Sequence, residues 1–173
     1  MEHQQGTQAQ KLFVDGLRNA HAMEKQALAM IKPQVNRIEN YPELVQRMRQ
    51  HWSETEGQIS RLETLLGQLG ESPSALKDTV MSVMGGAAVL GHTPAGDEIL
   101  KDSIANFAFE NYEIAAYTSL IALASASGHA EAIAPLEQTL SEEEDMAAFL
   151  EQNLAPVTAK FVALRESGAK AKH

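Results

Sequence analysis

Three glutamates in this sequence lie in the middle of apolar stripes on predicted helices. Glu24, Glu110 and Glu143 each stand among hydrophobic residues spaced three and four positions apart. At ~100° of rotation per residue, each carboxylate falls within roughly 20° of the centre of its stripe. An ionised carboxylate is costly to bury without a partner, so three at core positions need one explanation. Carboxylates that point inward from separate helices are typical of a metal site inside a helix bundle.

The second predicted helix offers a polar group on one flank. His51, Glu54 and Gln58 follow at spacings of three and four, so one face presents them together. A di-metal site in a bundle uses a Glu from each of two helices, plus a Glu–His pair from each of the others. His51-x-x-Glu54 supplies one pair in reversed order. Glu110-x-x-Glu113 supplies a second pair, although Glu113 lies roughly 80° from the centre of its stripe.

The residue types limit the metal chemistry. Carboxylates can bridge two cations, imidazole with carboxylate suits iron or manganese, and an all-oxygen shell also tolerates magnesium or calcium. We therefore expect two divalent metal ions, with iron favoured and manganese or magnesium as alternatives. The competing interpretation pairs each glutamate with a lysine at a helix flank, for which Lys25, Lys101 and Lys160 are the candidates, although Lys25 points about 100° away from Glu24. The acidic run around Glu143 predicts a solvated face at Glu142, Glu144 and Asp145.

Other chemistry has less support. Tyr117 lies two turns beyond Glu110 on the same stripe, where it would be a core residue or a donor to a metal ligand. His21, His92 and the histidines near termini or helix edges do not group as ligands. The sequence has no GxGxxG, GxxxxGK[ST] or GxSxG motif. It also has no cysteine, which excludes disulfides, iron–sulfur clusters and thiol catalysis.

Composition favours a helical protein of one domain. The 173 residues are 44% hydrophobic and only 5% aromatic, with six prolines and 11 glycines, which fits helix-on-helix packing. A net charge of −9 argues against a nucleic-acid partner. No run of ~18 apolar residues could span a membrane, and the first residues are polar, so we expect a cytoplasmic protein without a membrane partner.

Five helical segments can be predicted from the periodicity. They run over about 7–38, 40–69, 97–128, 129–153 and 156–165, with Pro33 expected to bend or interrupt the first. Residues 70–96 are predicted to be a crossover with one short helix near 80–90. Two helical hairpins joined by this long connection predict a ferritin-like four-helix bundle with an added C-terminal helix. The alternative is an up-down bundle with an inserted subdomain. The whole chain, 1–173, is expected to form one domain, with a frayed tail from about residue 166.

Four segments resemble the bacterial YciE/YciF family of ferritin-like stress proteins: LRNAHAMEKQA, NYPEL…QHWSETEGQI, FENYEIAAYTSL and the closing EEEDMAAFL. The resemblance extends from about Phe13 to Arg165 and is nearer to the YciE branch. It implies a homodimer and a role in bacterial stress responses. It also implies a di-metal site from Glu24, Glu54, Glu110 and Glu143, with His51 and Glu113 nearby, and it is this resemblance that selects Glu54. The usual Glu-x-x-His pattern is not met, because Gly57 and Met146 occupy the histidine positions.

Two functions are compatible with these residues. The first is a di-metal oxidase or peroxidase that acts on oxygen or peroxide and takes electrons from an external donor, since the chain has no cysteine relay. The alternative is a non-enzymatic, dimeric stress protein whose metal, if any, is structural. Iron storage would need a cage of many subunits, and nothing in the sequence indicates one.

Overall fold

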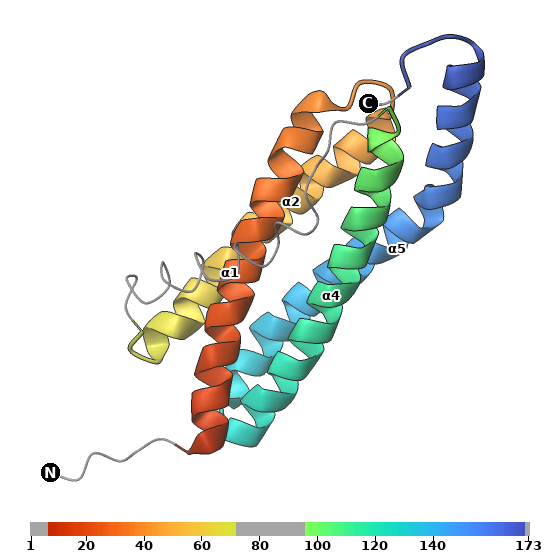
Figure 1. The fold of residues 1–173 in the computed structure, drawn as a ribbon. Coiled ribbons are helices and arrows are strands. Elements are labelled where there is room, and N and C mark those ends of the chain that lie inside the picture. Colours follow the sequence, from red (N-terminus) through yellow and green to blue (C-terminus); the bar gives the residue numbers. More distant parts are fainter. Residues whose placement is uncertain (1–6, 72–95, 172–173) are drawn as a thin grey trace, which may run out of the picture.

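Four helices account for nearly all of the described residues. The computed structural model describes residues 7–71 and 96–171, and the crossover with its predicted short helix lies outside that part. The helices are α1 (Gln8–Arg37), α2 (Pro42–Gln68), α4 (Glu98–Ser127) and α5 (Ala130–Glu166). Figure 1 shows them side by side as one bundle, which confirms the predicted all-α, ferritin-like class. None of these helices carries an apolar stretch long enough to cross a membrane.

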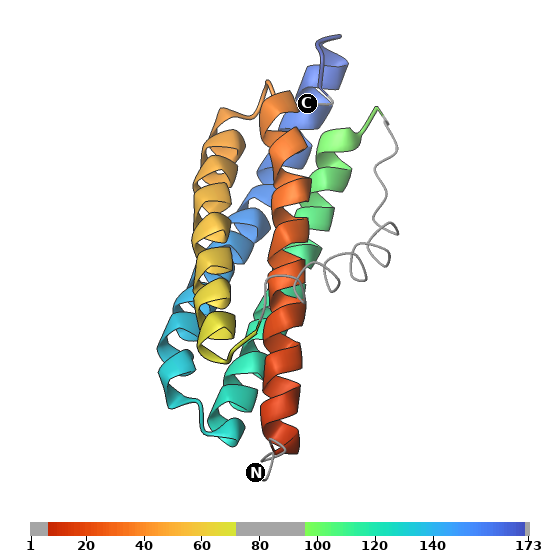
Figure 2. The same cartoon turned by 90° about the vertical axis from the view of Figure 1, so that its left-hand side faces the viewer.

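The order of the helices around the bundle follows from the connections. α1 packs on α2 and α4 packs on α5, each pair as an antiparallel hairpin; α1 also contacts α4, and α2 contacts α5. Figures 1 and 2 show α2 and α4 running in the same direction at opposite corners. The end of α2 and the start of α4 therefore lie at opposite ends of the bundle, as the predicted one-crossover topology requires.

Local signals in the sequence set the helix ends. Thr7 caps α1 through a reciprocal capping box with Gln10. Pro42 occupies the first turn of α2, where its missing N–H costs nothing. Gly128 ends α4 with a φ of 80°, a left-handed conformation that glycine adopts without strain. Pro33 lies inside α1 and does not interrupt it.

The predicted break between the fourth helix and the C-terminal helix is absent. The two form one element, α5, which contains Pro156 and changes direction in its last third (Figure 1). Proline removes one backbone hydrogen bond and bends a helix, but packing on both sides can hold the helix together. Leu150 before the proline and Val157 after it are buried in the same hydrophobic cluster, which explains the continuity.

The interior has three layers along the bundle axis. One apolar cluster includes Phe13, Leu17, Leu62, Leu66, Leu120 and Leu136. A second, near the α1–α2 turn, includes Ile31, Leu44, Met48, Ile99, Leu150 and Val157. The predicted ligands Glu24, His51, Glu110, Glu113 and Glu143 belong to neither cluster, and on each helix they lie in sequence between residues of the two clusters. The bundle therefore encloses a polar layer between two apolar ones.

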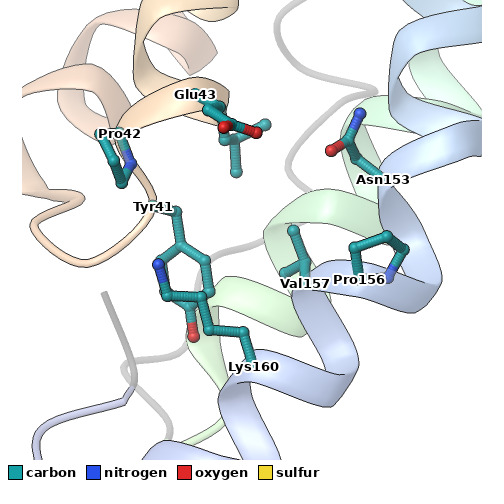
Figure 3. A pocket seen from close by; sticks show the side chains of 8 residues that line it. Tyr41, Pro42, Glu43, Asn153, Pro156, Val157 and Lys160 are labelled. Carbon is teal, nitrogen blue, oxygen red and sulfur yellow. The ribbon is translucent and has the colours of Figure 1, made fainter.

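The end of the chain returns to the α1–α2 turn. The hydroxyl of Tyr41 donates to the carbonyl of Ala171 at 2.9 Å, and Asn40 donates to the carbonyl of Lys170 at 3.0 Å. Beside them, Figure 3 shows a pocket of about 180 Å³ between the start of α2 and the bend of α5. Lys160 covers the ring of Tyr41 there, 5.3 Å from its centroid. No predicted metal ligand lines this pocket, so it is separate from the polar layer.

Candidate metal centre

Four of the predicted ligands meet in the polar layer. His51 of α2, Glu110 and Glu113 of α4 and Glu143 of α5 each offer one ligand atom, and these atoms all lie within 4.8 Å of one another. All four side chains are buried. The helical wheel left the direction of the Glu113 side chain open, and the structure shows that it points inward. A group of three carboxylates and one imidazole is a suitable donor set for iron or manganese.

His51 connects this group to Glu54. Its Nε2 lies 3.3 Å from Glu110 Oε2 and 3.5 Å from Glu143 Oε2, whereas its Nδ1 lies 3.1 Å from Glu54 Oε2. Arg47 holds the same Glu54 oxygen at 2.9 Å. Glu54 thus contacts the ring nitrogen that faces away from the cluster and orients the imidazole, as carboxylates commonly do for metal-bound histidines. Whether Glu54 also binds metal directly stays a prediction.

Glu24 lies beside the four-residue group without being part of it. Its side chain is completely buried, and the hydroxyl of Tyr117 donates to its Oε1 at 2.5 Å. Its charge acts on Glu113 and Glu143, which places it among the same carboxylates. Tyr117, also fully buried, is therefore a core residue and a donor to a predicted ligand at the same time.

The most informative feature of the centre is its unpartnered oxygen atoms. Within residues 7–71 and 96–171, both carboxylate oxygens of Glu113 and of Glu143 are buried without a hydrogen-bond partner, as are one oxygen of Glu24 and one of Glu110. Buried polar groups in native proteins are nearly always satisfied, and each exception needs an explanation such as an ion. These oxygens converge from three helices, so a bound cation would satisfy them together.

A second set of buried acids shows the contrast. Glu98 and Asp102, at the start of α4, are as buried as the acids of the centre. Arg37 of α1 pairs with both of them, at 2.7 Å and 3.1 Å. Among the described residues, this second set of buried acids therefore has a cationic partner, whereas Glu113 has none.

The predicted lysine alternative is not realised in the described residues. Lys25 pairs with Glu63 at 3.7 Å and Lys101 with Asp97 at 2.9 Å. Lys160 covers the Tyr41 ring, far along the chain from the acids of the centre. The cationic group nearest the cluster is instead the imidazole of His51, and one imidazolium cannot neutralise four carboxylates.

Burial and mutual repulsion keep Glu24, Glu113 and Glu143 protonated in the absence of metal. Burial raises the pKa of Glu24 from 4.5 to about 8 and that of Glu143 to about 10. It raises the pKa of Glu113 well above the usual range, helped by the charge of Glu24. Burial alone would lower the pKa of His51, but the close carboxylates of Glu110 and Glu54 outweigh it and raise the value to about 10.

Glu54 behaves in the opposite way. Partial burial would raise its pKa, but hydrogen bonds with His51, Arg47 and Gln50 outweigh this effect and lower the pKa to about 2. Glu54 is therefore ionised at every physiological pH, and its charge stabilises the His51 imidazolium. Glu113 and Glu143 inside the centre and the supporting Glu54 consequently differ in protonation, because their surroundings differ.

Three polar residues beside the centre make contacts that the sequence did not predict, although Gln58 was expected on the same flank as His51 and Glu54. Gln58 of α2 is fully buried and donates to Glu142 Oε2 of α5 at 3.1 Å. Arg61 pairs with the same carboxylate. These contacts leave Glu142 only partly solvated, with 21% of its side chain exposed, whereas Glu144 and Asp145 are exposed as predicted. The relative rotation of α2 and α5 decides this contact, and no residue pattern within one helix reports it.

A protein-family model described as Domain of unknown function (DUF892) matches residues 8–163. That span contains all six predicted metal-site residues. This chain belongs to the DUF892 family. Over 144 residues it is 31% identical to YciF of Escherichia coli (strain K12), a match that covers 77% of this chain and 82% of YciF. The predicted YciE/YciF family is thereby confirmed, and the placement in the YciE branch stays a prediction.

Solved structures share the fold of this DUF892 chain. A protein from Xanthomonas campestris pv. campestris superposes with a TM-score of 0.77 at 30% identity, covering 92% of this chain and 99% of that one. YcfI from Rhodopseudomonas palustris gives 0.66 at 25% identity, with coverages of 87% and 98%. The E. coli stress protein YciF gives 0.68 at 24% identity, with coverages of 86% and 96%, which by itself supports the fold alone.

Proposed function

We propose that this protein binds two divalent cations, iron in the first place, between Glu24, Glu110, Glu113, Glu143 and His51. The buried carboxylate oxygens without partners carry this proposal. The donor set also fits, since oxygen donors with one imidazole suit iron and manganese. Glu54 contacts the Nδ1 of His51, which faces away from the cluster, and it binds metal itself if its side chain turns inward when metal binds.

We further propose that the loaded protein is an oxidase or peroxidase that reduces oxygen or peroxide. Bound iron or manganese would supply the redox change, and electrons would come from an external donor. The protein's own residues have defined tasks. Tyr117 holds Glu24 by its hydroxyl proton, Glu54 fixes the His51 ring, and the two apolar clusters exclude water along the bundle axis.

The alternative is a non-enzymatic stress protein with a structural metal. One observation favours it: His51 already lies within 3.3 Å and 3.5 Å of two carboxylates, so part of the charge is neutralised internally. For either function we infer a cytoplasmic homodimer in the stress response, in line with the description of E. coli YciF as a stress protein. Light scattering of the purified protein gives the oligomeric state directly.

Elemental analysis of protein purified without chelator tests metal binding. The expected result is about two metal atoms per chain, as in other di-metal bundles. Glu143→Gln should lose most of this metal, whereas Glu144→Gln, which removes the same charge from an exposed position of α5, should retain it. Metal-free wild-type protein that also takes up no iron or manganese on dialysis would refute the proposal.

Oxidation of the bound metal separates the two functions. Iron-loaded protein is mixed with oxygen or peroxide while its absorption spectrum and the consumption of oxidant are recorded. Repeated turnover with an added reductant, lost in a folded Glu110→Ala variant, supports the enzyme. Metal that stays reduced, or that raises the melting temperature without any turnover, supports the structural alternative.

A further inference from the structure

The centre can be reached only from the side of the bundle. The two apolar clusters fill the interior on either side of the polar layer, and both are composed of fully or nearly fully buried hydrophobic side chains. A cation that crosses such a layer must give up its hydration water, and the apolar side chains offer no ligand to replace that water. The cation must therefore pass between two neighbouring helices, through a seam that offers it oxygen atoms.

The seam between α2 and α5 carries a row of polar residues at the level of the centre. On α2 they occur at spacings of three and four, so they lie on one flank: Arg47, Gln50, Glu54, Gln58 and Arg61. The contacts of Gln58 and Arg61 with α5 show that this flank faces α5. α2 and α5 also pack less closely than the other neighbouring pairs.

Within this row, Gln58 connects the surface to the interior. Its Nε2 donates outward to Glu142 at 3.1 Å, while its Oε1 is buried without a hydrogen-bond partner. Glu142 reaches solvent and directly precedes the predicted ligand Glu143. Arg61 closes the seam from the same side: it pairs with Glu142, donates to Thr139 at 3.1 Å, and lies near enough for its charge to act on Glu24.

The other seams are less suitable. Between α1 and α4 a hollow of about 220 Å³ exists, but its buried lining is formed by Ala20, Met23 and Leu120, which offer no ligand atom. Between α1 and α2, His21 contacts the half-exposed Glu63 at 3.0 Å. The Nδ1 of His21 has no hydrogen-bond partner among the described residues, so the side-chain hydrogen bonds do not continue from Glu63 toward the centre.

We propose that divalent cations enter the centre through the α2–α5 seam, where Glu142 first receives them and Gln58 passes them inward once the Arg61–Glu142 pair opens. This inference rests on the proposed metal-binding function. It assigns a role in loading to residues outside the predicted ligand set. Both side chains of the pair are partly exposed, at 20% and 21%, so water and an arriving cation can reach the pair and displace Arg61.

The rate of metal uptake tests the route. Metal-free protein is mixed with Co²⁺ in a stopped-flow instrument, and quenching of Trp52, the single tryptophan and the residue next to His51, reports arrival at the centre. Equilibrium dialysis with Co²⁺ gives the amount bound at the end. The variants are Glu142→Gln and Arg61→Gln. Two matched controls lose the same charge elsewhere: Glu144→Gln on the exposed face of α5, and Glu63→Gln at the mouth of the α1–α2 seam.

The expected changes have opposite signs. Glu142→Gln removes the receiving charge and leaves Arg61 to repel the cation, so uptake should slow about tenfold at low salt and less at high salt. Arg61→Gln should accelerate uptake, which a mere loss of function would not do. Both controls should match the wild type, and all variants should bind the same final amount of Co²⁺.

Two kinds of failure are distinguishable. In the first case the wild type retains Co²⁺ at equilibrium, but Glu142→Gln takes it up at the wild-type rate or Glu63→Gln slows uptake instead. The proposed route is then wrong, whereas the proposal of a metal centre is unaffected. If the wild type retains no Co²⁺, the proposed function fails and the route with it. Should Glu142→Gln unfold, Arg61→Gln still decides, since unchanged or slower uptake in that variant overturns the route.

Discussion

Metal-free protein should become less stable as the pH rises from about 5 to about 7.5. The pKa of Glu143 is raised from 4.5 to about 10, chiefly by burial and then by the charge of Glu24. Across this interval the folded protein therefore keeps a proton that the unfolded chain releases. Because the folded state binds more protons, the free energy of unfolding falls with rising pH.

The size of the effect follows from the width of the interval. A group protonated only in the folded state contributes about 1.4 kcal/mol per pH unit, so Glu143 alone predicts a loss of about 3 kcal/mol. Glu24, with a pKa of about 8, acts in the same direction, and so does His51 above its usual titration range. The pKa of Glu54 is lowered to about 2, so its contribution is lost only in more acidic solution, outside the interval.

The change in the free energy of unfolding is measured by urea titration in the presence of a chelator, followed by circular dichroism at both pH values. Glu143→Gln should remove about 3 kcal/mol of the pH dependence, while Glu144→Gln should keep all of it, since that side chain is exposed. A wild-type stability that is flat or increases toward pH 7.5 would contradict the reasoning. So would a Glu143→Gln variant with the wild-type slope.

Three further substitutions have defined outcomes. Tyr117→Phe leaves a buried oxygen of Glu24 without its donor and should lower the free energy of unfolding by about 1–2 kcal/mol in urea titrations. Arg37→Met removes the cation that pairs with two buried acids of α4; we expect a loss of about 2–4 kcal/mol with an unchanged metal content by elemental analysis. Tyr41→Phe removes the bond to the C-terminal tail and should cost about 1 kcal/mol, with faster carboxypeptidase digestion of the tail as the direct readout.

The helical wheel identified the buried glutamates because each belongs to a long stripe of regular spacing. Glu24, Glu110 and Glu143 are all almost completely buried, as their central positions predicted. Glu113 sits at the edge of its stripe, and its burial depends on how far α5 covers that edge. A single helix does not contain this information, so the wheel left Glu113 open and the packing of two helices decided it.

Contacts between helices were the part that the sequence could not predict. The pairs Gln58–Glu142 and Arg61–Glu142 join residues that are 84 and 81 positions apart. They depend on the axial offset of α2 and α5, which neither helix encodes alone. The continuity of α5 through Pro156 was missed for a related reason: proline is locally unfavourable in a helix, and only the tertiary packing of Val157 compensates for it.

The layered interior has a consequence for engineering this scaffold. Both apolar layers are complete without the acids, so aliphatic side chains of similar volume in place of the middle layer should give a tighter, metal-indifferent protein. A consensus or computational thermostability screen would therefore favour substitutions that remove the proposed metal ligands. Heat resistance gained there would measure how much stability the native chain gives up to keep buried acids in its middle layer.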